Sequence, residues 1–317
     1  MTMNAMTEIP IREHANPAAK ARPAAAMLSV LVPFYRDDPT SLLEGLSPLM
    51  RAFDDVELVL YDDGEPDADL NRQVCASIDL LDVPVRLLTS VRNRGRAAGR
   101  NLLAEQASGS WLLYLDADMT PPDRHFLTRY RETMAANDCD AVFGGYETEW
   151  PTDPGLRLHA ELSRRSDQHD AATRNETGPT AFCSSNLLVR ASVMQACPYD
   201  DQFTGWGWED VDWAASAAHR FKLVHIDNPA CHGGLQTADI LLEKFRDGAA
   251  NYKRLLTRHP ELADLPGARA ARLLKSLPGQ HRLRGLWAHM TTSPFLPLRI
   301  RALALKLWRA SWASEVI

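Results

Sequence analysis

Short apolar runs that alternate with helical patterns constrain the fold of this 317-residue chain more than any other feature. The apolar runs cover residues 27–33, 56–61, 83–88 and 111–115, and the helical patterns cover 39–53, 68–78 and 96–107. This alternation is typical of a mostly parallel sheet with helices on both faces. We therefore predict an α/β fold, with further strands at 141–145, 185–190 and 221–226.

Acidic residues follow three of these apolar runs, at the point where each predicted strand ends. They are Asp37 and Asp38, Asp62 and Asp63, and Asp116 and Asp118. Ligands of open parallel sheets bind beyond the carboxyl ends of the strands. The sequence therefore predicts a binding site at this edge of the sheet.

The chain divides into three parts. Residues 1–26 are rich in Ala and Pro without the apolar run of a signal peptide, and we expect a flexible leader there. Residues 27–235 are expected to form the α/β domain, in two halves that meet at residues 120 and 121. Residues 236–317 are expected to form a helical, basic extension, which begins with one long amphipathic helix at 236–257.

The net charge of −6 is divided unevenly along the chain. Residues 268–317 carry nine Lys and Arg against one Glu, about +8, which leaves about −14 for the remainder. A basic segment that also carries Trp287, Trp308 and Trp312 could lie at the surface of an anionic membrane. A helical cap packed on the acidic body is equally compatible with this pattern.

Several classes of protein are disfavoured by the sequence. No apolar stretch reaches the ~20 residues needed to span a bilayer. The five cysteines form no CxxC pair, so neither a zinc site nor a disulfide framework is indicated, and a reducing cytoplasm is favoured. No nucleic-acid-binding motif accompanies the basic residues, so we expect no nucleic-acid partner.

Asp116 and Asp118 form a DxD sequence directly after the apolar run 111–115. Residues i and i+2 of an extended segment point the same way, so both carboxylates can face one ligand. Mg²⁺ and Mn²⁺ prefer oxygen ligands, usually one or two carboxylates together with substrate phosphates. The alternative is a loop with two solvated acids that cap the next helix.

A basic, glycine-containing loop at residues 92–101 enters a predicted helix and includes Asn93, Gly95 and Arg100. Cations and free backbone N–H groups at the start of a helix favour a diphosphate. The loop lacks the GxGxxG pattern of dinucleotide cofactors. The alternative for this loop is an ordinary solvated helix face. For Asp63, the alternative to a binding role is an ordinary acidic turn.

Two segments in the second half of the domain also carry candidate residues. Residues 205–213 contain three tryptophans among acids and glycines, and Trp206 and Trp208 could stack on sugar faces while Glu209 or Asp210 acts as a general base. Packing of the tryptophans in the core is the alternative. His232, followed by two glycines, is a plausible further metal ligand beside the DxD sequence, although a lone His is more often structural.

Taken in order, these elements resemble the family-2 glycosyltransferases of the GT-A fold. Four segments match. Residues 29–35 include Pro33 and Tyr35, and residues 61–64 include Asp63. The loop at residues 92–101 includes Asn93, Gly95 and Arg100, and the last segment is 115–118. Residues 205–210 resemble the Gly-Trp-Gly-x-Glu-Asp motif of β-1,4-galactosyltransferases and chondroitin-polymerase-type enzymes. Trp208 stands where that motif usually has Gly, so the resemblance does not extend to galactose, and its ring would narrow the sugar pocket.

The resemblance implies a role for each half of the domain. Residues 27–120 would bind the nucleotide of a nucleotide-sugar donor, with Asp63 on the nucleobase and Asp116 on the ribose or metal. Asp118 would be the main ligand of Mn²⁺ or Mg²⁺, and His232 the second. The donor-binding residues would be Pro33, Tyr35, Asp63, Asn93, Gly95, Arg100 and Asp116.

Residues 121–235 would bind the acceptor. Asp210 would be the catalytic base, Glu209 would bind the acceptor beside it, and Trp206 would line the sugar subsites. The resemblance therefore implies an inverting transfer of a sugar, from a UDP-sugar by preference, to a glycan or lipid-linked saccharide in bacterial surface polysaccharide synthesis. Such an enzyme would be cytoplasmic, with a peripheral contact to the inner face of the plasma membrane through the basic extension.

Two other functions are compatible with the sequence. One is a sugar- or nucleotide-binding protein on a degenerate transferase scaffold, against which the intact Asp118, Asp210 and His232 argue. The other is a metal-dependent hydrolase of nucleotide sugars, which would turn over its substrate without an acceptor.

Overall fold

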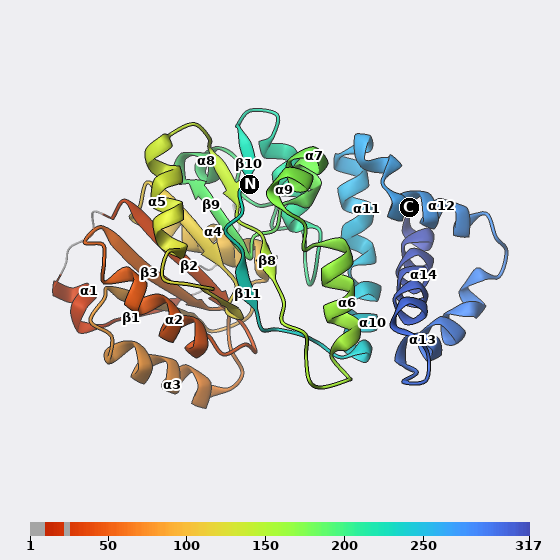
Figure 1. Cartoon of the computed structure of the whole chain (residues 1–317), viewed down its shortest axis with the longest axis horizontal. Helices are drawn as coiled ribbons and strands as arrows, with labels where there is room; N and C mark the ends of the chain where they lie inside the picture. Colours follow the sequence, from red (N-terminus) through yellow and green to blue (C-terminus); the bar gives the residue numbers. More distant parts are fainter. Residues whose placement is uncertain (1–9, 22–25) are drawn as a thin grey trace, which may run out of the picture.

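A computed structural model describes residues 10–21 and 26–317, and its largest element is an eight-stranded sheet (Figure 1). The strand order is β1 (Ile11–Ala15), β4 (Val85–Ser90), β3 (Val56–Asp62), β2 (Leu28–Phe34), β5 (Trp111–Leu115), β9 (Asn186–Arg190), β7 (Ala141–Phe143) and β10 (Leu223–His225). Strands β4, β3, β2 and β5 are mutually parallel, as are β7 and β10, while β9 and β1 run antiparallel to their neighbours. The prediction of an α/β fold is confirmed, and every strand of this sheet except β1 overlaps a predicted strand.

Helices cover both faces of the sheet because the β-branched and leucine side chains of its central strands alternate between two cores. One core packs α2 (Thr40–Met50), α3 (Ala68–Asp79) and α5 (Phe126–Ala136) against residues such as Val30 and Val32 of β2. The other packs α4 (Arg96–Gln106), α8 (Ala191–Ala196) and α9 (Glu209–Ala217) against residues such as Leu31 of the same strand.

The expected flexible leader is wrong for part of its length, because Ile11–Ala15 form edge strand β1, antiparallel to β4. The fully buried Asn16 anchors this strand, and short helix α1 (Pro17–Ala21) follows it. The side-chain amide of Asn16 donates to the carbonyl oxygens of Ile78, Leu81 and Val83 at 2.9–3.1 Å. Residues 1–9 and 22–25 of the predicted leader lie outside the described residues.

A small second sheet brings together two distant parts of the chain. It consists of β6 (Met119–Thr120), β11 (Ala230–His232) and β8 (Tyr146–Glu147). In the antiparallel pair of β11 with β6, His232 lies opposite Met119. Because Met119 follows the DxD sequence directly, this pairing places His232 beside Asp118.

Helices of the extension and one earlier helix surround α14 (Leu298–Val316), as Figure 1 shows at the C-terminal end. Around it pack α10 (Ala238–Asp247), α11 (Ala249–Arg258), α12 (Pro266–Lys275), α13 (Arg284–Thr292) and α6 (Arg157–Ser166). The expected long helix at 236–257 is instead two helices, α10 and α11, which meet at Gly248. A Cβ atom on Gly248 would lie 3.0 Å from the carbonyl oxygen of Trp206, so glycine permits this close approach.

The remaining elements are α7 (Ala171–Thr177) and three short 3₁₀ helices at Gly178–Ala181, Pro260–Asp264 and Gln280–Leu283. Through residues 10–21 and 26–317, no helix is both long enough and apolar enough to cross a membrane.

Candidate active site

A cluster of ion pairs lies at the carboxyl end of β5, where Asp116 meets two arginines of α4. Nη2 of Arg100 lies 2.7 Å from Asp116 Oδ1, and Nη2 of Arg96 lies 3.3 Å from Oδ2. Arg100 is 1% exposed, so its charge requires this partner. Burial opposes ionisation of Asp116, but the two guanidinium groups outweigh it and hold the pKa of Asp116 below its usual value.

The same cluster fixes the start of α9. Arg96 Nε donates to Glu209 Oε1 at 2.7 Å, and Glu209 is 3% exposed. Arg96 therefore links the end of β5 to the acidic first turn of α9. Sequence analysis did not single out Arg96, and its position in the basic loop was the only signal for it.

Asp210 is the neighbour of Glu209 on the first turn of α9. Its carboxylate accepts hydrogen bonds from Ser184 Oγ and, at 3.5 Å, from Cys183 Sγ. Burial raises the pKa of Asp210, and the charge of Glu209 adds to this rise. A raised pKa brings a carboxylate closer to the range in which a general base works at neutral pH.

Asp118 and His232 face each other across the small sheet, with 3.3 Å between Asp118 Oδ2 and His232 Nε2. Gly233 N–H donates to the backbone oxygen of Asp118 at 2.8 Å, and a Cβ atom on Gly234 would lie 1.8 Å from Asp118 Oδ2. The two glycines therefore let the chain pass directly over the carboxylate.

The two polar atoms of this pair that do not face each other are unsatisfied. Within the described ranges, buried Asp118 Oδ1 and His232 Nδ1 have no hydrogen-bond partner. No group of three or more His, Cys, Asp or Glu that could hold a metal ion is found among the same residues. The roles of Asp118 and His232 as ligands of Mg²⁺ or Mn²⁺ therefore stay predictions, and such a site would need substrate phosphates as further ligands.

Asp63 holds the loop that enters α4. Its Oδ1 accepts from Arg94 N–H at 2.7 Å and from the hydroxyl of Tyr61 at 2.9 Å, and its Oδ2 accepts from Gly95 N–H at 2.9 Å. Gly64 makes room for the loop, because at φ 76° its Cβ atom would lie 2.4 Å from the carbonyl carbon of Arg92. The nucleobase contact of Asp63 stays a prediction beside this observed role.

The other predicted donor residues lie around the same edge. Pro33 and Tyr35 are half-buried at the end of β2, and Asn93 is exposed in the loop that Asp63 organises. Gly95 has a φ of 89°, a backbone conformation that glycine adopts readily. Their roles in donor binding stay predictions.

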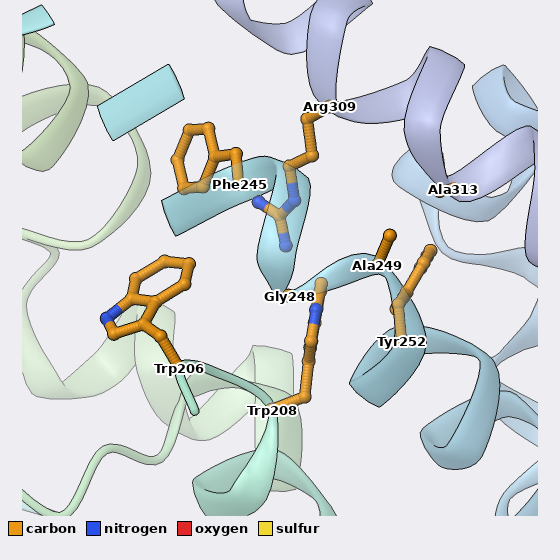
Figure 2. A pocket seen from close by; sticks show the side chains of 8 residues that line it. All are labelled: Trp206, Trp208, Phe245, Gly248, Ala249, Tyr252, Arg309 and Ala313. Carbon is orange, nitrogen blue, oxygen red and sulfur yellow. The ribbon is translucent and has the colours of Figure 1, made fainter. Parts of the chain in front are cut away.

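The tryptophans before α9 face the helical extension (Figure 2). Trp208 stacks on Tyr252 of α11, with ring centroids 4.4 Å apart and an angle of 20° between the planes. Trp208 has a φ of 79°, a value that favours glycine, and this backbone turn directs its ring toward α11. Trp206 contacts Phe245 of α10, with 5.4 Å between ring centroids.

Asp37, which belongs to the predicted acidic edge, lies near the DxD sequence together with Lys244 and His159, which were not among the predicted site residues. Asp37 is exposed, but partial desolvation by neighbouring groups and the charge of Asp118 raise its pKa. Lys244 of α10 lies close enough to interact electrostatically with Asp37 and Asp118, while burial lowers its pKa. His159 of α6 accepts a hydrogen bond from Gln236 N–H at Nδ1, and burial lowers its pKa to about 4.

The mostly parallel sheet, the DxD sequence at a strand end and the acidic helix start are features of a glycosyltransferase of the GT-A fold. Residues 29–195, more than half of the chain, match the model of Glycosyl transferase family 2. The chain therefore belongs to family 2 of the glycosyltransferases and is a glycosyltransferase enzyme.

Curated relatives and solved structures agree with this assignment. Glycosyltransferase AglE of Haloferax volcanii is 24% identical over 229 residues, which cover 70% of this chain and 71% of the relative. An uncharacterized glycosyltransferase of Haemophilus influenzae is 33% identical over 93 residues, 29% of this chain and 36% of the relative.

Among solved structures, one similar to this chain is mannosyltransferase PcManGT of Pyrobaculum calidifontis, in complex with GDP-Man and Mn²⁺. It matches with a TM-score of 0.55 at 17% identity, over 91% of this chain and 87% of the PcManGT chain. Residues 1–349 of TarS of S. aureus match with a TM-score of 0.52 at 13% identity. The match covers 91% of this chain and 89% of the TarS chain. These likenesses show the fold.

Removal of the buried Arg100 cation should destabilise the fold. We expect Arg100→Met to lower the free energy of unfolding in urea by about 3 kcal/mol, the lower end of the cost of breaking a buried ion pair, because Arg96 still faces Asp116. The control is Arg92→Met, an exposed arginine of the same loop, which should change stability by less than about 0.5 kcal/mol. Equal effects of the two substitutions would contradict this role of Arg100.

Proposed function

We propose that this enzyme transfers a sugar, with inversion, from a nucleotide-diphosphate sugar to a hydroxyl of a glycan or lipid-linked saccharide. The observation that carries the proposal is the contact between Asp118 and His232, with 3.3 Å from Oδ2 to Nε2, two residues beyond Asp116 in the DxD sequence. Asp210 lies on the adjoining helix start with a raised pKa.

Two partly accessible cations, Arg96 and Lys244, support diphosphate binding at this edge, while the buried Arg100 acts through Asp116. Arg96 and Arg100 are fixed by Asp116, and Lys244 acts on the same carboxylates from the extension. The family resemblance favours UDP. Among similar structures, that of PcManGT holds GDP-Man with Mn²⁺, and that of a mycobacterial glucosyl-3-phosphoglycerate synthase holds UDP-Glc with Mn²⁺.

The proposed chemistry is a single displacement. A bound Mn²⁺ or Mg²⁺, held by Asp118 and His232, would stabilise the negative charge of the departing diphosphate. The acceptor oxygen forms a bond to the anomeric carbon while the bond from that carbon to the diphosphate oxygen breaks. Asp210 takes the proton of the acceptor hydroxyl. Glu209, the predicted acceptor-binding residue, is buried and paired with Arg96, so we expect it to position Asp210.

Donor binding tests the metal site directly. In a thermal-shift panel of UDP-, GDP- and dTDP-sugars, we expect one nucleotide class to raise the melting temperature with Mn²⁺ present and to lose this effect in Asp118→Ala. The matched control is Glu132→Ala, an exposed acid of α5, which should keep the full shift. A shift that persists in Asp118→Ala would contradict the assigned metal ligand.

The base can be tested through its pH dependence. Asp210 must be ionised to take a proton, so transfer should fall as the pH drops through its raised pKa. Ser184→Ala removes a hydrogen bond that favours the ionised form, and we expect it to raise this pKa and move the acidic limb of the kcat profile to higher pH. Above that pKa, Asp210→Asn should lower kcat by about 10²–10⁴-fold, and the acidic limb should disappear.

A purely structural role of Ser184 would lower activity equally across the profile. Such a uniform loss, with no movement of the acidic limb, would contradict the proposed hydrogen bond to the catalytic base.

We also propose that the helical extension docks on the cytoplasmic face of an anionic membrane, where a lipid-linked acceptor is presented. Several large apolar side chains of the extension are exposed: Leu273, Leu277, Leu283, Leu286, Phe295, Ile300 and Leu303. The extension also carries the basic excess of the chain. Exposed apolar groups beside basic residues favour an anionic lipid surface.

Phe295, which is 93% exposed between α13 and α14, provides the test of membrane docking. We expect Phe295→Asp to reduce flotation with phosphatidylglycerol vesicles several-fold, because it replaces an inserted ring with a charge that the lipid repels. The control is Leu80→Asp at the end of α3, where an apolar side chain 87% exposed lies outside the extension. Equal loss in both variants, or no flotation of the wild type, would overturn the docking proposal.

A role in bacterial surface polysaccharide synthesis fits such a membrane-bound acceptor. The alternatives are a binding protein on a degenerate scaffold, which would show no turnover, and a hydrolase, which would release the sugar at the full rate without an acceptor. Turnover that requires an acceptor separates the transferase from both.

A further inference from the structure

Helix α11 of the extension holds the part of the chain that leads into α9, residues 200–212. The polar residues of α11 that contact it are three and four positions apart and therefore share one face of the helix. They are Asn251, Arg254 and Arg258. The match to Glycosyl transferase family 2 ends at residue 195, so α11 and residues 200–212 both lie beyond it.

A left-handed turn directly before α9 is held by α11. Gly207 and Trp208 have φ values of 90° and 79°, and this conformation costs free energy at Trp208, which carries a Cβ atom. The buried Asn251 donates from Nδ2 to the carbonyl oxygens of Thr204 at 2.9 Å and Gly207 at 3.0 Å. The ring of Trp208 stacks on Tyr252 of the same helix (Figure 2). Contacts from α11 therefore stabilise the turn from which α9 begins.

Arg258 joins the two ends of residues 200–212. Its Nε donates to Asp212 Oδ1 at 2.6 Å, and its Nη1 lies 3.3 Å from Asp200 Oδ2. Arg254 donates to the same oxygen of Asp200 from Nη2 at 2.6 Å. The side chains of Asp200 and Asp212 are only 13% and 3% exposed, so their charges require these partners.

His259, the residue after α11, completes the surroundings of Asp212. Its Nε2 lies 3.0 Å from Asp212 Oδ1 and 3.4 Å from Ser216 Oγ of α9. Its Nδ1 lies 3.3 Å from Glu261 Oε1. The buried carboxylate of Asp212 therefore contacts two consecutive residues, Arg258 and His259, at the end of α11.

Asp210 and Asp212 lie on opposite faces of the first turn of α9, since two residues turn an α-helix by about 200°. Asp210 contacts Ser184, and its neighbour Glu209 contacts Arg96 at the catalytic edge. Asp212 contacts α11 on the other face. The first turn is thus held from two sides, and loss of either side lets it move.

We infer that Arg258 and Asn251 of α11 are positioning residues for the transfer reaction. By holding residues 200–212, they keep the proposed base Asp210 at its hydrogen bond with Ser184. The inference rests on the proposed transferase function and adds to it a requirement for the extension. The competing explanation is a contact that stabilises the fold without acting on the base.

Two substitutions that remove opposite ends of one contact test this role. Arg258→Gln removes a positive charge beside α9, and Asp212→Asn removes a negative charge from it. Displacement of Asp210 from Ser184 would raise the pKa of Asp210 in both variants, because that hydrogen bond favours the ionised form. We therefore expect the acidic limb of the kcat profile to move to higher pH in both. Above the limb, kcat should fall by about 10- to 100-fold, with KM for the donor unchanged.

An effect of charge alone would move the two limbs in opposite directions, because Arg258→Gln would raise the pKa of Asp210 and Asp212→Asn would lower it. Such opposite movement, or a uniform loss of activity at every pH, would overturn the positioning role. Lys253→Gln is the matched control, since it removes an exposed cation from another face of α11. It should leave the profile unchanged.

Arg258→Lys decides the question if Asp212→Asn fails to fold. It keeps the charge and loses the planar fork that spans both carboxylates. The acidic limb should still move to higher pH, by less than in Arg258→Gln. A limb that stays at its wild-type position in Arg258→Lys, while Arg258→Gln moves it, would assign the effect to charge and overturn the inference.

Hydrogen exchange measures the support of α9 without turnover. Amides of residues 205–217 should exchange about tenfold faster in Arg258→Gln than in wild type, equal to about 1.4 kcal/mol of local stability. Lys253→Gln should exchange at the wild-type rate. Unchanged exchange in Arg258→Gln would overturn the inference even in a protein without transferase activity. Absence of transfer by the wild type would instead contradict the proposed function, so the two failures are distinguishable.

Discussion

The buried ion-pair cluster around Arg96 and Arg100 is the interaction on which the candidate site depends. Charges removed from water are tolerated only when each has a partner, and here the partners are Asp116 at the end of β5 and Glu209 at the start of α9. The two arginines of α4 therefore force a strand end and a helix start to meet. Because Asp210 directly follows Glu209, this meeting also brings Asp210 to the carboxyl end of β5.

The fold was predictable where its signal is local. Alternating apolar runs and helical patterns located the strands of the large sheet and the helices between them, because periodicity within one element reflects which side chains it buries. The edge strand β1 and the break at Gly248 were missed for the opposite reason. Strand β1 depends on Asn16 filling a buried position against distant carbonyl groups, and the break depends on the approach of Trp206.

The site was predictable only in part. The DxD sequence and the tryptophan segment were found because several unusual residues stand together in the chain. Arg96, His159, Lys244 and Ser184 are ordinary residues in ordinary contexts, and only folding brings them to the same place. The extension contributes Lys244, so a region that was predicted to be a cap or membrane contact also interacts with the carboxylates of the DxD sequence.

The pairing of β11 with β6 has a consequence for how the protein matures. Asp118 and His232 belong to strand ends that are far apart in the chain, and neither can complete the pair until the intervening acceptor half has folded. Metal and nucleotide would thus bind only the finished domain and, by mass action, stabilise it against unfolding. Cellular donor concentration would then set not only the rate of transfer but also how long each enzyme molecule survives proteolysis.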